Sequence, residues 1–120
     1  MSRTWRALIR VVVATLTFRL RRYEIAEESM APSLRPGDRV LATRRPREVR
    51  PGNVVVFQLR PGFDVVKRVV APPAGTTGLW VLGDNPAAGS VDSRTFGPVS
   101  PDQIEARIEL RSRPWPWRAV

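Results

Sequence analysis

Cysteine and histidine are both missing from the 120 residues of this chain. Without cysteine the chain has no disulfide framework and no thiolate nucleophile, and without both residues it lacks the usual ligands of a zinc site. The same absence excludes a Ser-His-Asp triad and a Cys-His pair. Any enzymatic proton transfer must therefore use carboxylates, a tyrosine or a lysine. The composition leaves both a membrane-associated and a cytoplasmic location open.

Lysine is almost absent as well, because Lys67 is the single lysine among 20 basic residues. A desolvated amine can lose its proton near neutral pH, whereas a guanidinium cannot. If residues 65–69 form a strand, Lys67 shares a face with Val65 and Val69, and these apolar neighbours should lower the pKa of its amine. Lys67 is therefore a candidate general base, although a lysine on a solvated strand face would fit the composition equally well.

Acidic residues are absent from residues 1–22, which carry six arginines and hence most of the net charge of +9. On a helix, at about 100° per residue, one side of this segment is rich in arginine and the other is apolar. The apolar stretch at residues 11–18 would rise only about 12 Å, well short of the roughly 30 Å of a hydrocarbon core. We therefore expect a basic amphipathic helix that either lies on an anionic membrane surface or packs its apolar side on its own domain. The side chains expected on the apolar side are Trp5, Leu8, Ile9, Val12, Val13, Leu16 and Leu20.

Long helices are disfavoured after residue 22, because prolines and glycines recur along the rest of the chain. Residues 104–111 alternate apolar and charged side chains, which is typical of a half-buried strand. We therefore predict one all-β domain at residues 23–120, preceded by the helical segment at residues 1–22. Further strands are predicted where short apolar or β-branched runs are bounded by turn residues, at 54–59, 64–71 and 79–82.

Among the serines, Ser29 stands out by its context. It opens a stretch at residues 29–38 that is too rich in proline for a helix. Such a rigid, irregular segment can hold a hydroxyl and its own backbone N–H outward, and that N–H can donate a hydrogen bond to an oxyanion. From the residues alone, an ordinary loop serine remains the alternative.

Three segments resemble, in the same order, the motifs of type I signal peptidases. Residues 29–34 with Gly37-Asp38 are similar to the nucleophile motif, and residues 67–69 are similar to the general-base motif. Residues 83–85 together with residues 90–98 resemble the last block of that family. The resemblance implies an all-β fold with the coiled, mostly antiparallel sheet of the signal peptidase and LexA-like type.

The resemblance also implies a reaction. Ser29 would attack the scissile peptide bond and Lys67 would take its proton, so the protein would be a serine endopeptidase with a Ser-Lys dyad. Peptide hydrolysis would pass through an ester on Ser29 and would need no metal or organic cofactor. The substrate would add to the site as an extended strand, with small residues favoured one and three positions before the cleaved bond.

Four supporting roles follow from the same resemblance. Ser90 would hydrogen-bond to the lysine amine and orient it, Asp92 and Arg94 would pair to hold their loop, and Met30 would line the substrate pocket. One position departs from the pattern, since Glu27 stands where some members place a serine whose hydroxyl binds the oxyanion. An ionised carboxylate cannot donate that hydrogen bond, so the second donor is left unassigned.

The short spacing between Lys67 and Gly83 leaves no room for the second β-domain of the large bacterial members. The chain is similar in this respect to the short proteases that mature nickel-type superoxide dismutase, and its substrate would then be the leader of that precursor. Two alternatives are a general signal peptidase for exported proteins and a non-enzymatic basic β-domain that binds nucleic acid. A LexA-type self-cleaving protein shares the Ser-Lys chemistry, but the residues before Ser29 are too few for a DNA-binding domain and a cleavable linker. We expect a precursor or leader peptide as partner, a membrane surface as a second candidate partner, and no nucleic acid.

Overall fold

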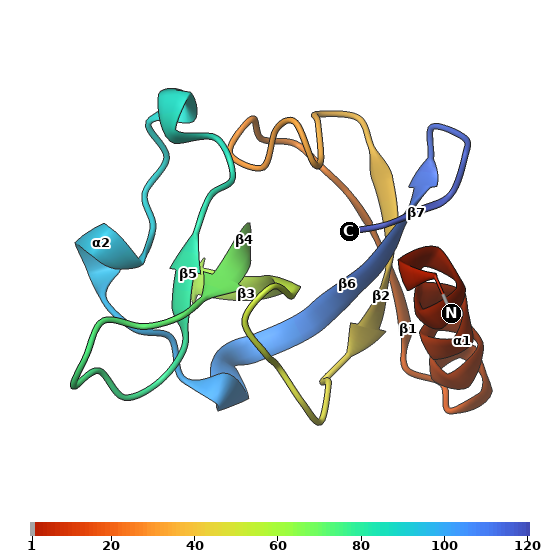
Figure 1. Cartoon of the computed structure of the whole chain (residues 1–120), viewed down its shortest axis with the longest axis horizontal. Coiled ribbons are helices and arrows are strands. Elements are labelled where there is room, and N and C mark those ends of the chain that lie inside the picture. The colour runs from red at the N-terminus through yellow and green to blue at the C-terminus, as the bar shows by residue number, and fades with distance from the viewer. Residues whose placement is uncertain (1) are drawn as a thin grey trace.

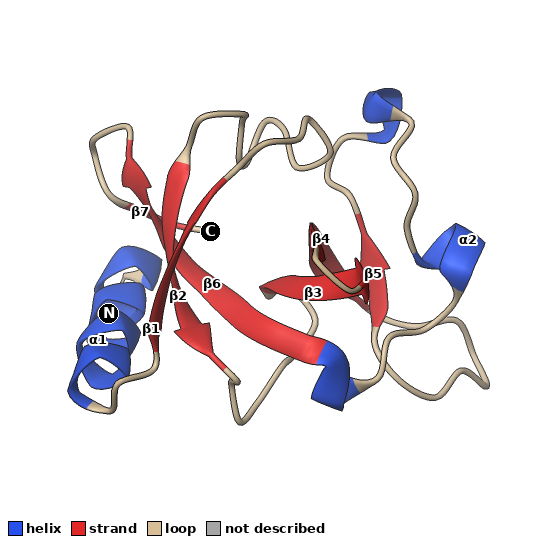
Figure 2. Cartoon of the chain, turned by 180° about the vertical axis from the view of Figure 1, so that it is seen from behind, coloured by secondary structure: helices blue, strands red, loops and turns tan. Residues whose placement is uncertain are grey.

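A strongly curled antiparallel β-sheet forms most of the structure, a computed structural model that describes residues 2–120 (Figure 1). The strands follow the order β1-β2-β6-β3-β4-β5 across the sheet, and β7 pairs with the outer end of β6. Seen from behind, β1, β2 and β7 lie on one side and β3, β4 and β5 on the other, with β6 crossing between them (Figure 2). The strands are β1 (Leu20–Glu24), β2 (Arg39–Arg44), β3 (Val54–Arg60), β4 (Phe63–Val70), β5 (Trp80–Leu82), β6 (Ile104–Arg113) and β7 (Arg118–Ala119). The predicted fold, a coiled antiparallel sheet after a short N-terminal helix, is confirmed.

The long strand β6 allows the sheet to curl. One edge of β6 pairs with β2 over residues 106–113 and the other edge pairs with β3 over residues 104–108; the register shifts twice in the pairing with β2. Such bulges bend a strand and increase its twist. The four predicted strands correspond to β3, β4, β5 and β6, whereas β1 and β2 were not predicted individually.

Two apolar clusters fill the interior of the curled sheet. At the start of β3, Val54, Val55 and Val56 are all fully buried, so this part of the strand is covered on both faces. Val54 and Val56 belong to one cluster, which also contains Met30 and Leu34 from the β1–β2 connection. Val55 belongs to the other cluster, which lies beneath β4, β5 and the long β5–β6 connection. Both loops that carry the motif residues are therefore fixed to the core.

Helix α1 (Arg3–Leu16) packs on the outside of the sheet against β2, β6 and β7. Its N-terminus is capped by Ser2, whose hydroxyl accepts a hydrogen bond from the Trp5 N–H at 3.0 Å. The helix contacts the sheet through Ala7, Val11 and Ala14, which are buried. Small side chains allow the helix to approach the sheet closely, and this explains why they form the contact.

The face of α1 that carries the large apolar side chains is thus not the packing face. Five of the seven side chains expected on the apolar side are 42–74% exposed, whereas Leu8 and Leu20 are partly buried against the cluster that the helix forms with the sheet. Of the two predicted arrangements of this helix, packing on its own domain is found. Its fully buried residues, however, lie on the opposite side of the helix from most of the large apolar side chains. Strand β1 begins at Leu20, so the predicted segment at residues 1–22 ends inside it. Within residues 2–120, no helix combines the length and the apolar character needed to cross a bilayer.

The β1–β2 loop and the first part of the β5–β6 connection lie at the same end of the sheet (Figure 1). The β5–β6 connection contains a short helix, α2 (Ser93–Phe96), and two 3₁₀ turns, η1 (Pro86–Ala88) and η2 (Pro101–Gln103). The backbone N–H of Asn85 donates to the Ser29 carbonyl at 2.9 Å and thereby joins the two connections.

Candidate active site

Ser29 lies in the β1–β2 loop, where the chain turns tightly. The Ala31 N–H donates to the Glu28 carbonyl at 3.1 Å, so Ser29 occupies the turn between them. The Met30 side chain is 1% exposed and packs in the core, and the Ser29 residue itself is 6% exposed. Met30 thus anchors the loop, and its predicted place in a substrate pocket stays a prediction.

Lys67 lies on β4, with its side chain almost completely buried at 3% exposure. Val69 on the same face belongs to the core, and Val65 packs against it. Burial lowers the pKa of the Lys67 amine, while the negative charges of Asp92 and Glu27 raise it in part; the net pKa is below its ordinary value. The amine nitrogen Nζ donates to Ser90 Oγ at 3.1 Å. The structure therefore brings Lys67 and Ser90 together.

Gly83 is the point at which Ser29 meets the Lys67–Ser90 pair. A Cβ built on Gly83 would lie 3.5 Å from Ser29 Cβ and 3.2 Å from Ser90 Oγ. The two serine side chains thus flank the same glycine. Between Ser29 and Lys67 themselves, no hydrogen bond is found in the described part of the chain.

Asp92 and Arg94 form the pair that the sequence predicted. Arg94 Nε and Nη2 donate to the two carboxylate oxygens of Asp92 at 3.1 and 2.8 Å. Asp92 also caps α2 by accepting the Arg94 backbone N–H at 3.0 Å. Hydrogen bonds from Arg94 lower the pKa of the Asp92 carboxyl, against the effect of its burial. The next residue, Ser93, accepts the Val81 N–H at 2.8 Å and thereby fixes this loop to β5.

The sequence analysis did not predict a second ion pair, between Arg68 and Asp84. Arg68 follows Lys67 on β4, and its Nε and Nη2 each donate to Asp84 at 2.9 Å, one to each carboxylate oxygen. Burial raises the pKa of the Asp84 carboxyl, but hydrogen bonds from Arg68 and Ser33 outweigh this effect, and the net pKa is below its ordinary value. Such a bidentate pair fixes direction as well as distance. It ties β4 to the segment that contains Gly83, and the signal in the sequence was a charged residue directly after Lys67 and another directly after Gly83.

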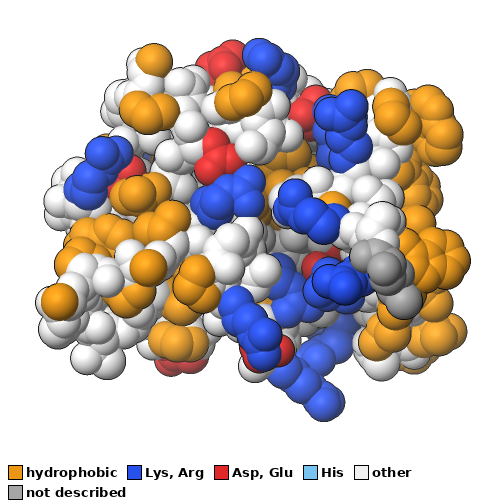
Figure 3. Space-filling view, viewed as in Figure 1, with side chains coloured by type: hydrophobic (Ala, Val, Ile, Leu, Met, Phe, Trp, Pro, Cys, Tyr) orange, Lys and Arg blue, Asp and Glu red, His pale blue; other side chains and the backbone are white. Residues whose placement is uncertain are grey.

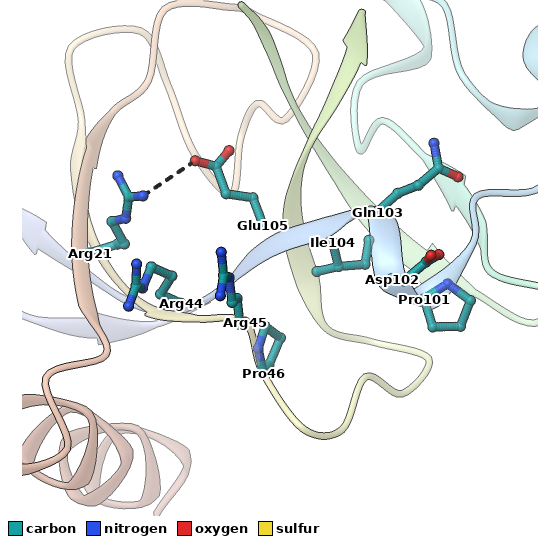
Figure 4. Close-up of a pocket in the computed structure, with 9 residues that line it drawn as sticks. All are labelled: Arg21, Arg44, Arg45, Pro46, Pro101, Asp102, Gln103, Ile104 and Glu105. Atoms are coloured by element: carbon teal, nitrogen blue, oxygen red, sulfur yellow. Dashed lines mark ion pairs between the residues drawn. The ribbon is translucent and has the colours of Figure 1, made fainter. Parts of the chain in front are cut away.

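The described residues contain no group of three acidic side chains close enough to hold a metal ion. A cavity of about 460 Å³ lies elsewhere, between the β1–β2 strands and the start of β6 (Figure 4). Arg21, Arg44 and Arg45 line this cavity, and Arg21 Nη2 lies 3.9 Å from Glu105 Oε1. None of the predicted site residues lines this cavity. Its lining residues are Arg21, Arg44, Arg45, Pro46, Pro101, Asp102, Gln103, Ile104 and Glu105.

Comparison with known protein families gives one match. The family described as signal peptidase, peptidase S26, matches residues 2–77, a span that includes Ser29 and Lys67 but not Ser90 or Asp92. No curated protein matches the sequence. Because the family match covers more than half of the chain, this protein belongs to the signal peptidase family, peptidase S26, whose members are proteases that act on precursor proteins.

Proposed function

We propose that the protein is a serine endopeptidase in which Ser29 is the nucleophile and Lys67 is the general base. The observation that carries this proposal is the environment of Lys67: the residue is 3% exposed, the pKa of its amine is lowered, and Nζ donates to Ser90 Oγ. A neutral amine has two N–H donors and one lone pair. When Ser90 accepts one N–H, the lone pair is left free to accept the proton of the Ser29 hydroxyl.

The reaction balances with these two residues and water. Ser29 Oγ attacks the scissile carbonyl carbon as its proton passes to Lys67 Nζ, and the proton then moves to the departing amine. The C–N bond breaks and leaves an ester on Ser29. Lys67, again neutral, takes a proton from water as the water attacks the ester, and that proton returns to Ser29 Oγ as the acid product leaves.

The other predicted residues act on the positions of these groups. Ser90 orients the Lys67 amine directly through the 3.1 Å hydrogen bond. Asp92, held by Arg94, caps α2 and fixes the loop that carries Ser90. The negative charge of Asp92 also limits how far burial lowers the pKa of Lys67.

The substrate we propose is a precursor protein from which an N-terminal leader is removed. The short catalytic core favours the nickel superoxide dismutase precursor, and exported proteins with signal peptides are the alternative. Both substrates would present a small residue directly before the cleaved bond. Cleavage of each purified precursor, read by mass spectrometry of the products, distinguishes them.

The cleavage test compares Ser29→Ala with Ser112→Ala, in which a serine on β6 outside the site is changed. We expect the wild type and Ser112→Ala to cut a peptide with alanines one and three positions before an internal bond, and Ser29→Ala to be inactive. Persistent cleavage by purified Ser29→Ala of the same melting temperature would refute the assignment of the nucleophile.

We also propose that the outer face of α1 holds the enzyme at an anionic membrane surface. Opposite the packed stripe, the helix exposes Trp5, Ile9 and Leu16. Hydrophobic side chains line the edge of the molecule where α1 lies, and basic side chains form a band beside them (Figure 3). The first 22 residues contain six arginines and no acidic residue. If two copies of the protein joined through this face, their arginines would repel one another, whereas the negative charges of anionic lipid would neutralise the arginines.

Two aspartates test this surface without disturbing the fold. Val12→Asp and Leu16→Asp, made together on the exposed face, should abolish sedimentation with phosphatidylglycerol vesicles and leave cleavage of a soluble peptide unchanged. The control Leu59→Asp alters an exposed leucine on β3, outside the helix, and should leave vesicle binding intact. Unchanged vesicle binding by the double variant, or a wild-type dimer in solution that the double variant loses, would contradict a membrane role for this face.

A further inference from the structure

Asn85 holds the main chain on both sides of the Ser29 α-carbon. Its backbone N–H donates to the Ser29 carbonyl at 2.9 Å, and its side-chain Nδ2 donates to the Glu28 carbonyl at 3.1 Å. The Glu28 carbonyl also accepts the Ala31 N–H at 3.1 Å. One residue that is far from Ser29 in the sequence thus fixes both carbonyls next to the nucleophile.

The two hydrogen bonds that the Glu28 carbonyl accepts set the direction of the Ser29 N–H. In a trans peptide the C=O of one residue and the N–H of the next point in opposite directions. Since the Glu28 carbonyl faces Asn85 and Ala31, the Ser29 N–H faces the other way. Within residues 2–120 this N–H donates to no protein group, so it is free to bind a substrate oxygen.

Asn85 is itself fixed in place. It precedes Pro86, and a residue before proline is restricted to extended conformations; its φ and ψ are −114° and 92°. Two residues earlier, Gly83 passes so close that a Cβ there would lie 2.8 Å from the Ser29 carbonyl oxygen. The segment from Gly83 to Asn85 is therefore in direct contact with the β1–β2 loop that carries Ser29, and there is no room for a side chain between them.

We propose that Asn85 is a positioning residue for the oxyanion site: its two hydrogen bonds fix the Glu28–Ser29 peptide so that the Ser29 N–H faces the developing negative charge. This role rests on the proposed function of Ser29. It is needed in this chain because Glu27 cannot donate a second hydrogen bond when ionised, so the orientation of the Ser29 N–H carries more of the stabilisation.

The test uses Asn85→Ala and Asn85→Asp with two probes, a fluorogenic Ala-Ala-Ala peptide substrate and the matching peptide aldehyde. The aldehyde forms a hemiacetal on Ser29, whose oxygen takes the place of the oxyanion. Loss of a whole oxyanion donor costs about 10²–10³ in kcat, and a misdirected donor should cost about 10- to 100-fold. We expect kcat to fall by that factor with KM unchanged, and aldehyde affinity to fall in parallel.

Three further measurements separate positioning from a general structural role. The pH dependence of kcat/KM should be unchanged in Asn85→Ala, because this substitution adds no charge and leaves Lys67 and Ser90 untouched. Asn53→Ala removes the other asparagine of the chain, whose side chain accepts the Arg50 N–H in a turn outside the site, and should have wild-type kinetics. Asn85→Asp keeps the size and the backbone N–H but cannot donate from its side chain when ionised, so it decides the question if Asn85→Ala fails to fold.

Wild-type kcat and aldehyde affinity in either folded variant would overturn the proposal, as would a loss of activity in Asn85→Ala that comes only from a shifted pH profile. The failure of the proposed function itself would look different. In that case Ser29→Ala would keep its activity, whereas a failure of the present inference alone leaves Ser29→Ala inactive and Asn85→Ala active.

Discussion

Replacing Gly83 by alanine should lower kcat/KM by about tenfold or more while the protein stays folded. The new Cβ would lie 2.8 Å from the Ser29 carbonyl oxygen and 3.2 Å from Ser90 Oγ. Ordinary van der Waals contacts of a Cβ begin at 3.4 Å, so the Ser29 main chain must move by roughly half an ångström. A displacement of about 1 Å at a catalytic group can cost 10²-fold in rate, and half of it should cost about tenfold.

Gly83 is suited to this test because crowding is the only effect of the substitution. Its φ does not lie in the left-handed region, in contrast to the other seven glycines. Gly62→Ala is the matched control, since Gly62 has a φ of 79° and open space around its Cα. That control should lose about 1–2 kcal/mol of stability from backbone strain and keep its activity.

The assay is kcat/KM on the alanine-containing peptide, together with the melting temperature of each variant. Overpacking at Gly83 should cost about 1–3 kcal/mol of stability, which a domain of ordinary stability survives. A Gly83→Ala enzyme with wild-type kcat/KM would show that Ser29 and Ser90 are not held across this glycine during catalysis, and the described site would then be wrong.

The remaining predictions concern Lys67 and the absent residue types. Since burial lowers the pKa of Lys67, kcat/KM should rise with pH through one ionisation below the ordinary value of about 10.5; a flat profile would mean that the amine stays charged. At pH values between the lowered pKa of Lys67 in the folded protein and its ordinary value of about 10.5, the unfolded chain binds more protons than the folded protein, so the free energy of unfolding of the wild type should rise with pH. Lys67→Met has no buried amine, so it should be more stable than the wild type near neutral pH. The difference in stability between the two proteins should shrink as the pH approaches 10.5. Urea unfolding of both proteins at several pH values measures this, and a difference that does not vary with pH would contradict it. Chelators and thiol reagents should leave activity intact, and a loss that zinc restores would refute the dyad.

The sequence predicted the sheet well where the strand signals were simple. Strand β6 shows regular alternation, and the apolar run of β3 is bounded by turn residues. Strand β1 was missed because its sequence, Leu-Arg-Arg-Tyr-Glu, has few apolar residues and lies at the edge of the sheet. Its pairing with β2 comes from the tertiary structure and not from its own propensity.

Helix α1 shows a different limit. An amphipathic pattern identifies the face with the largest apolar side chains, whereas close packing on a sheet favoured the small stripe of Ala7, Val11 and Ala14. The helix itself was predicted correctly, but the side that packs could not be, because that depends on the shape of the surface formed by β2, β6 and β7.

In the site, the motifs predicted the residue types that approach one another, including the hydrogen bond between Lys67 and Ser90. The contacts that Gly83 and Asn85 make with Glu28 and Ser29 could not be predicted, because they join segments more than fifty residues apart in the chain. Only the folded sheet brings these segments together, so the motif at residues 83–85 identified the residues but not the contacts that they make with Glu28 and Ser29.

The central claim is that Lys67 acts as a neutral base, and the activity of Lys67→Arg tests it most directly. Arginine keeps the positive charge and the hydrogen-bond donors but cannot accept a proton near neutral pH. With folding verified by melting temperature, we predict that kcat/KM of Lys67→Arg falls to the level of Ser29→Ala, because members of one catalytic unit fail together. A folded Lys67→Arg protein that retains substantial kcat/KM, free of contaminating protease, would contradict the account.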